Sequence, residues 1–179
     1  MINKVFRPFN YRSLTTSGRR TMSGFHKSQS DQLDATLTVV DEHDNIIGET
    51  TKLAGHEKTL ESFGEGRHIQ HPHRAFSLFL FNEHNELLLQ QRSAEKITFP
   101  NLWTNSVCSH PTHTPDEIDT EDYKGPRLAA VRRTAFELNL PLDFDSLHCG
   151  ARILYYADAD TRFAEYEIDY IVFAKMNSP

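Results

Sequence analysis

The sequence predicts a single domain of the mixed α+β class, and three observations support that prediction. The chain has 179 residues and a mass of 20.6 kDa, the size of one domain with a substantial hydrophobic core. Several short apolar segments separated by polar turns indicate β-strands, whereas one segment has clear helical spacing. The 38% hydrophobic and 25% charged residues exclude collagen-like, coiled-coil and wholly disordered chains.

Two β-hairpins are expected in the first half of the chain. Their turns are residues 41–45 and 82–86, which are rich in Asp, Glu, Asn and His. The near-continuous apolar run at 78–81 predicts a strand that is buried on both faces. The four strands are expected at residues 35–40, 46–48, 75–81 and 87–91.

The second half predicts one helix followed by two further strands. A polar, acid-rich loop runs from Pro111 to Pro126, and Pro126 suits the start of a helix over residues 127–138. One apolar face of this helix is expected to pack on the domain, and it comprises Leu128, Val131, Ala135 and Leu138. The strands are expected at residues 152–157 and 167–174.

Charge divides the chain into an arm, residues 1–30, and a body, residues 31–179. No Asp or Glu precedes Asp31, and the arm holds six of the 19 basic residues, which leaves 13 against 25 acidic residues, about −12, in the body. An Arg- and Ser-rich arm without acids is typical of an organelle-targeting presequence. The alternative is a flexible tail that carries no targeting signal. Translation that starts at Met22 would omit most of the arm.

The composition also limits the function classes. An acidic body argues against nucleic-acid binding, because neutralising phosphates needs clustered Lys and Arg. No apolar run approaches the length that spans a bilayer, so no membrane association is expected. Two cysteines, Cys108 and Cys149, exclude a disulfide framework as the main source of stability.

Candidate chemistry begins with Cys108 and His110 in the segment TNSVCSHP, residues 104–111. A thiol two residues from an imidazole, in a turn rich in Asn, Ser and Pro, is typical of a metal site or an activated cysteine. Taken alone, the segment is explained more simply by a buried, inert cysteine.

Two further pairs of charges stand out. Glu165 and Glu167 alternate along a strand, so both carboxylates point to the same face and require a raised pKa or a cation between them. A solvent-facing strand edge is the simpler interpretation of this pair alone. Arg92 and Lys96 flank a short turn after a buried strand, where they either bind an anion or are surface charges.

Six motifs occur in a fixed order along the chain. They are residues 74–77 (RAFS), 88–92 (LLQQR), Pro100, 104–111 (TNSVCSHP), 132–133 with 137–138, and 165–170 (EYEIDY). Each is weak alone, but the combination resembles type I isopentenyl-diphosphate isomerases, which belong to the Nudix superfamily. The resemblance covers roughly three quarters of the chain.

The resemblance implies a Nudix-type mixed β-sheet sandwiched between helices. It implies an isomerase that interconverts isopentenyl and dimethylallyl diphosphate, in isoprenoid biosynthesis, by protonating an alkene and removing a proton from the neighbouring carbon. By motif position the catalytic residues are Cys108, Glu167 and Tyr155, the last as a proton relay. The implied ligands of the diphosphate are Lys52, Arg92, Lys96, Ser109 and Arg133.

Divalent metal ions are implied as well. The ligands of the first ion are His56, His73, His110, Glu165 and Glu167. Three imidazoles and two carboxylates favour Zn²⁺ or Mn²⁺, whereas the family is described with Mg²⁺ or Mn²⁺, so the identity of this ion stays open. A second Mg²⁺, bound with the diphosphate, is implied at Glu137.

The predicted helix favours an isomerase over a hydrolase. Nudix hydrolases carry Arg-Glu-x-x-Glu-Glu here, whereas residues 132–137 are RRTAFE. Two of the three glutamates are absent and Arg133 replaces one of them, so a metal cage for water activation is lost while diphosphate binding is retained. A Nudix hydrolase of a nucleotide or prenyl diphosphate is the alternative.

The family carries a C-terminal segment that closes the pocket, and this sequence ends at Pro179, before it. Residues 31–179 are therefore expected to form a Nudix-like isomerase domain without that segment, and an inactive binder is a further alternative. We otherwise expect a monomeric, cytoplasmic enzyme whose partner is a small-molecule prenyl diphosphate, with a mitochondrial form produced by the arm.

Overall fold

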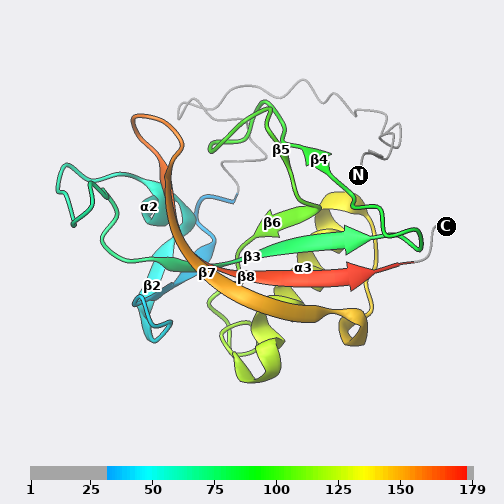
Figure 1. Cartoon of the computed structure of the whole chain (residues 1–179). Helices are drawn as coiled ribbons and strands as arrows, with labels where there is room; N and C mark the ends of the chain where they lie inside the picture. The colour runs from blue at the N-terminus through cyan, green and yellow to red at the C-terminus, as the bar shows by residue number, and fades with distance from the viewer. Residues whose placement is uncertain (1–31, 177–179) are drawn as a thin grey trace.

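The computed structural model describes residues 32–176, and Figure 1 labels its helices and strands. In chain order the elements are β1 (Thr36–Val40), β2 (Ile46–Thr51), α2 (Lys52–His56), β3 (His73–Phe81), β4 (Gln90–Gln91), β5 (Trp103–Thr104), β6 (Val107–Ser109), the 3₁₀ helix η1 (Glu121–Tyr123), α3 (Lys124–Leu138), the 3₁₀ helix η2 (Phe144–Ser146), β7 (His148–Asp158) and β8 (Ala164–Lys175). The arm predicted at residues 1–30 lies outside the described residues. None of the described helices is long and apolar enough to cross a membrane.

A mixed sheet organises the domain. Its order is β2-β1-β3-β8-β7, and β6 also pairs with β3. Strands β3 and β8 run parallel, whereas the other neighbouring pairs in this sheet are antiparallel. The strands predicted at residues 152–157 and 167–174 are confirmed as parts of β7 and β8. This mixed sheet with few helices confirms the predicted α+β class.

Helix α3 covers one face of the sheet, behind β3 and β8 in Figure 1. Because side chains alternate along a strand, β8 directs Ile168, Tyr170 and Val172 into the core under α3, where Ala129 and Ala130 are fully buried. Burying a large apolar side chain of this kind stabilises the fold by about 1.5–3 kcal/mol. The short α2 packs against β1, β2 and β8, so helices sandwich the sheet as the resemblance implied.

The buried face of α3 differs from the predicted one. Val131 and Leu138 pack on the core as expected, but Ala135 is exposed. The fully buried residues are Gly125, Pro126, Ala129, Ala130 and Thr134. These residues are small because the helix lies very close to its neighbours. A Cβ atom on Gly125, for example, would lie 2.2 Å from the carbonyl oxygen of Glu117.

The first predicted hairpin is confirmed, and the second is confirmed only next to its turn, where Leu87 pairs with Phe81 and the Leu88 amide donates to the Leu80 carbonyl at 2.9 Å. Strands β1 and β2 pair around the turn at residues 41–45. After β3 the turn at residues 82–86 closes with a 3.0 Å hydrogen bond from the Asn82 amide to the Glu86 carbonyl. The chain then leaves the sheet, and β4 pairs only with β5 in a separate ribbon, while β6 pairs with β3. Beyond Leu88, a distant segment, β6, therefore takes the rest of the place that the local pattern assigned to residues 87–91.

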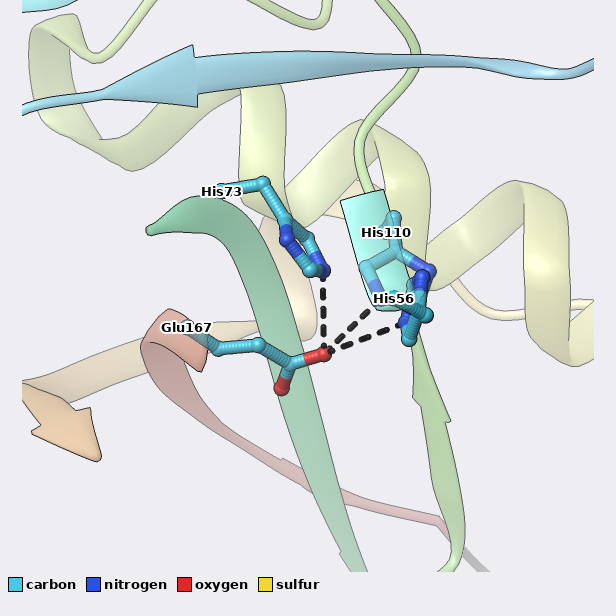
Figure 2. Close-up of side chains that lie close together, drawn as sticks. All are labelled: His56, His73, His110 and Glu167. Carbon is cyan, nitrogen blue, oxygen red and sulfur yellow. Dashed lines mark hydrogen bonds and ion pairs between the residues drawn. The ribbon is translucent and has the colours of Figure 1, made fainter. Parts of the chain in front are cut away.

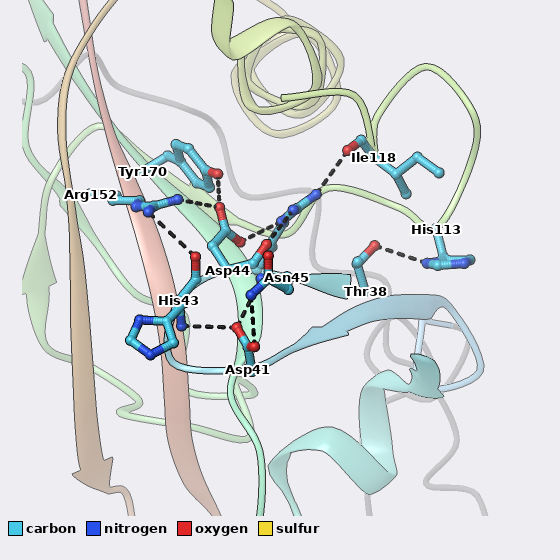
Figure 3. A network of polar contacts seen from close by, with 10 residues as sticks. Thr38, Asp41, His43, Asp44, Asn45, His113, Ile118, Arg152 and Tyr170 are labelled. Carbon is cyan, nitrogen blue, oxygen red and sulfur yellow. Dashed lines mark hydrogen bonds and ion pairs between the residues drawn. The ribbon is translucent and has the colours of Figure 1, made fainter. Parts of the chain in front are cut away.

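A buried carboxylate ties the turn of the first hairpin to the sheet (Figure 3). The Asp44 side chain, which is 3% exposed, accepts hydrogen bonds of 2.7 Å each from Arg74 Nε and Arg152 Nη1. The Tyr170 hydroxyl donates to the same carboxylate. Arg74 Nη1 also donates to the Ile118 carbonyl at 2.8 Å, which holds the acid-rich loop. One charge thus connects the turn, three strands and this loop.

Replacing Asp44 by Ala is expected to destabilise the domain by about 3–5 kcal/mol, because it leaves the buried Arg74 guanidinium without its counter-charge. Urea unfolding followed by circular dichroism measures the change. Asp116→Ala is the matched control, because the Asp116 side chain is 79% exposed and forms a surface ion pair with Lys124 at 3.4 Å. Such an exposed pair adds little stability, so the urea midpoint should stay unchanged. Equal midpoints for Asp44→Ala and the control would contradict this role of Asp44.

Candidate active site

The pairing of strands brings the predicted site residues to one face of the sheet. In the parallel β3–β8 pair His73 lies opposite Glu167, and in the antiparallel β7–β8 pair Tyr155 lies opposite the same Glu167. In the β3–β6 pair Ser77 lies opposite Cys108. This face is the one that α3 does not cover, so the polar residues project away from the apolar core.

Three histidines and one glutamate form a compact cluster, shown in Figure 2. His56 ends α2, His73 begins β3, and His110 directly follows β6. One oxygen of Glu167, Oε1, lies 2.9 Å from His110 Nε2, 3.3 Å from His73 Nε2 and 3.9 Å from His56 Nε2. The ligand atoms of all four side chains lie within 4.8 Å of one another.

The protonation states of this cluster suit a divalent cation. Burial lowers the pKa of His110 to about 4 and holds the pKa of His56 well below its usual range, so both rings are neutral near pH 7. Burial alone would raise the pKa of Glu167, but hydrogen bonds from His110 and His73 hold it well below its ordinary value. Neutral imidazoles around an ionised carboxylate are the ligand set that transition metals bind.

Two details of hydrogen bonding support the same interpretation. His56 Nδ1 lies 2.7 Å from the Lys52 carbonyl oxygen, which accepts a hydrogen bond from Nδ1–H and leaves the lone pair of Nε2 free toward Glu167. Within residues 32–176, Nδ1 of the buried His73 has no hydrogen-bond partner, and its Nε2 faces only Glu167 Oε1, at 3.3 Å. A buried imidazole with so few partners has the capacity to bind a ligand. The residues therefore fit a divalent metal ion.

Glu165, the fifth predicted ligand, lies beside this cluster rather than within it. Its side chain accepts a 3.2 Å hydrogen bond from the Tyr155 hydroxyl and also bonds to Thr98. Burial and the nearby charge of Glu167 raise the pKa of Glu165. The Tyr155 hydroxyl donates to Glu167 as well and so joins the two carboxylates.

Cys108 lines the same cavity as Glu167. Its sulfur lies 2.6 Å from Asn105 Oδ1, 3.5 Å from Thr104 Oγ1 and 3.7 Å from Ser77 Oγ. Burial raises the pKa of the thiol, so Cys108 holds its proton at neutral pH. A protonated thiol and an ionised carboxylate in one cavity are a donor and an acceptor for protons.

The cavity has a volume of about 320 Å³ and is lined by basic residues as well as by these acidic ones. Lys52, Arg92, Lys96 and Ser109 are the polar lining residues that were predicted to bind the diphosphate. Burial, together with the charges of Lys96 and Arg133, lowers the pKa of Lys52 to about 8. Half-buried cations that repel one another favour an anion as their ligand.

Arg133 and Glu137 stand apart from the histidine cluster. They pair across one turn of α3, where the Arg133 guanidinium donates to the Glu137 carboxylate. Arg133 lines a smaller pocket that shares Lys52 and Ser109 with the main cavity. Glu137 is thus placed among cations and not among the histidine ligands.

Some residues of the site had no predicted role. Asp169 lines the cavity, and burial and the charge of Glu167 raise its pKa to about 7. The alternation that places Glu165 and Glu167 on one face extends to Asp169, so this residue was detectable from the same pattern. Asn105 and Thr98 carry no such signal, because their contacts depend on how two loops fold back on the sheet.

Comparisons with known proteins identify relatives over most of the chain. Residues 71–178 match the NUDIX domain family. The isopentenyl-diphosphate delta-isomerase of Gibberella zeae is 43% identical over 162 residues, which is 87% of this chain and 62% of the relative. The isopentenyl-diphosphate Delta-isomerase 1 of Mesocricetus auratus is 47% identical over 153 residues, 83% of this chain and 65% of the relative.

The corresponding protein of Mus musculus is 42% identical over 158 residues, 87% of this chain and 67% of the relative. The chain therefore spans about two thirds of the length of these relatives. A relative from Cannabis sativa, 42% identical over 143 residues, 78% of this chain and 48% of that relative, is named as chloroplastic.

Changing His110 to Ala is expected to weaken Mn²⁺ or Zn²⁺ binding at least tenfold, because it removes one imidazole from the cluster. Glu165→Gln is expected to weaken it less, since that carboxylate lies beside the cluster. Isothermal titration of the metal-free protein measures both affinities. His113→Ala is the control, because His113 contacts Thr38 and Glu49 instead. Unchanged affinity in His110→Ala would show that the ligands are placed wrongly.

Proposed function

Since the chain belongs to the Nudix family and, within it, to the type I isopentenyl-diphosphate isomerases, we propose that it interconverts isopentenyl diphosphate and dimethylallyl diphosphate in isoprenoid biosynthesis. The observation that carries the proposal is a single cavity that holds Cys108, Tyr155 and Glu167 together with a group of half-buried cations. The cations match a diphosphate, and the other three residues match a proton donor, a relay and an acceptor.

We assign the binding of the diphosphate to five residues: Lys52, Arg92, Lys96, Ser109 and Arg133. Arg92 already holds the loop of the cavity, since its Nε and Nη2 donate to the carbonyls of Thr98 and Phe99 at 2.7–3.2 Å. The third guanidinium nitrogen of Arg92, Nη1, donates a hydrogen bond to a phosphate oxygen in this proposal. An oxygen-rich anion in this place offsets the burial and the mutual repulsion that lower the pKa of Lys52 and Lys96.

The reaction then moves one proton in and one proton out. Protonation at one carbon of the alkene gives a tertiary, carbocation-like species, and loss of a proton from the neighbouring carbon forms the new double bond. Cys108 acts on one face of the substrate and Glu167 acts on the other. Tyr155 donates a hydrogen bond to Glu167 and carries protons to and from that carboxylate.

We assign a divalent metal ion to His56, His73, His110, Glu165 and Glu167, with the first three and Glu167 forming the core of the site. When bound, the ion supplies positive charge that tunes the proton affinity of the Glu167 carboxylate. The imidazole-rich ligand set suits Mn²⁺ or Zn²⁺. The resemblance to the family gives Mg²⁺ as the alternative ion at this site. A second Mg²⁺ is proposed at Glu137, where the diphosphate supplies the other oxygen ligands.

The contacts of α3 favour isomerisation over hydrolysis. A hydrolase needs several helix carboxylates to hold the metals that activate water, and here Arg133 occupies one such position and pairs with Glu137. A cation at this position binds phosphate oxygens and does not activate water.

Cys108→Ala is expected to abolish isomerisation while the affinity for isopentenyl diphosphate stays within a few-fold, because a proton donor acts in the transition state and contributes little to ground-state binding. Product formation by the metal-loaded chain, followed by NMR with each diphosphate as substrate, measures the rate. Cys149→Ala is the control, since Cys149 does not line the cavity. Wild-type turnover in Cys108→Ala would remove this residue from the mechanism.

The same assay distinguishes the competing functions. Release of phosphate that survives Cys108→Ala would identify a Nudix hydrolase. Tight binding of the diphosphate by the wild-type chain, without isomerisation or hydrolysis, would identify a binder instead of an enzyme. Either result would overturn the proposed function.

We also propose that the protein acts as a monomer in the cytoplasm and that residues 1–30 direct a minor form to mitochondria. A fluorescent fusion to these residues is expected to give a mainly cytosolic signal with a mitochondrial fraction. Changing Arg19 and Arg20 to Glu should remove that fraction, because presequences require positive charge. A uniform cytosolic signal that these changes do not alter would contradict the targeting role.

A further inference from the structure

Two polar residues of the cavity, Ser77 and Asp169, have no part in the mechanism above. Asp169 lies on β8 two residues after Glu167, is 5% exposed and faces the same side of the sheet. Its Oδ2 accepts a 2.7 Å hydrogen bond from Ser77 Oγ. Within residues 32–176 its other oxygen, Oδ1, has no hydrogen-bond partner. Burying this carboxyl costs stability, and the fold offsets that loss with a single hydroxyl.

Ser77 connects Asp169 to Cys108. The two residues Ser77 and Cys108 are directly opposite in the β3–β6 pair, and Ser77 Oγ lies 3.7 Å from the sulfur. Because a serine hydroxyl has one proton, donating that proton to Asp169 leaves only lone pairs to face the sulfur.

The other neighbours of the sulfur are oriented in the same way. Thr104 Oγ1 donates its proton to Asn105 Oδ1 at 2.8 Å. Asn105 Nδ2 donates to the carbonyls of Leu78 and Val107 at 3.0 and 3.1 Å, which fixes the amide with Oδ1 toward the sulfur. The thiol donates its one proton to Asn105 Oδ1 at 2.6 Å, while the oxygens of Ser77 and Thr104 face the sulfur with lone pairs.

We propose that Asp169 is a positioning residue for Cys108 that acts through Ser77: it holds the proton of the Ser77 hydroxyl away from the sulfur, so that the S–H bond stays directed at Asn105 Oδ1. Without the Asp169 acceptor, the Ser77 hydroxyl rotates and donates to the sulfur, which turns the thiol proton away. The kinetic consequence rests on the proposed function of Cys108, whereas the orientation of the thiol does not.

Infrared spectroscopy of the S–H stretch tests the orientation without any need for activity. In the Cys149→Ala background the band arises from Cys108 alone, since these are the two cysteines of the chain. Asp169→Ala should shift the band, because the Ser77 hydroxyl then donates to the sulfur and disturbs the S–H bond to Asn105. Ser77→Ala removes that competing donor and should leave the band in place. Asp169→Asn retains an oxygen that accepts from Ser77 and should leave the band in place. Identical bands in all four proteins would overturn the proposal.

Kinetics of the same variants test whether Asp169 acts through Ser77. Asp169→Ala should lower kcat on the order of tenfold with KM nearly unchanged, because Ser77 then donates to the sulfur, and Asp169→Asn should retain most of the rate. The double variant Ser77→Ala/Asp169→Ala should be no slower than Ser77→Ala, because it lacks the competing donor. A double variant as slow as Asp169→Ala would show that Asp169 acts independently of Ser77 and would overturn the coupling.

Unchanged metal affinity and thermal midpoint in each variant separate this effect from damage to the fold. If the wild-type chain proves inactive, the proposed isomerase function fails, and the infrared shifts alone decide the proposal on Ser77 and Asp169.

Discussion

The register of the parallel pair β3–β8 is the constraint on which the rest of the structure depends. It places His73 opposite Glu167, and the alternation of side chains then directs Glu167 and Asp169 to the cavity and Tyr170 into the core under α3. A slip by one residue would bury the carboxylates in that core and expose its apolar side chains, at a large cost in stability. Strand β7 adds its tyrosine to β8, and β6 adds its cysteine to β3. One register thus fixes four elements of the site.

The chemistry of the cavity follows from how burial acts on groups of opposite charge. Burial by itself keeps Cys108 protonated and the histidines neutral, whereas donors from His73 and His110 keep Glu167 ionised. The fold thereby holds a proton donor and a proton acceptor in one small volume. The cations gathered around Lys52 repel one another until an anion binds. A substrate with a diphosphate at one end and an alkene at the other satisfies both requirements, and neither requirement is met by a nonpolar ligand.

Local patterns predicted the features that depend on neighbours in sequence, and they failed where distant segments decide. Alternation identified the strands, and motif positions identified the residues that converge on Glu167. The segment after the turn at residues 82–86 was predicted to pair with β3 throughout, but only Leu87 and Leu88 do so, and β6 pairs with β3 farther along. The small buried face of α3, including Gly125, follows from close packing that no apolar pattern encodes. The Ser77–Asp169 contact crosses two strands, so it became visible only in three dimensions.

The central claim is that one cavity, assembled by the β3–β8 register, delivers and removes a proton on a single substrate. Incubating the metal-loaded chain with isopentenyl diphosphate in D₂O and following the substrate by NMR and mass spectrometry tests that claim most directly. Proton transfer through exchangeable groups predicts deuterium in the newly formed methyl group of dimethylallyl diphosphate, with the diphosphate intact. Unlabelled isopentenyl diphosphate, or free phosphate with no carbon-bound deuterium, would contradict it.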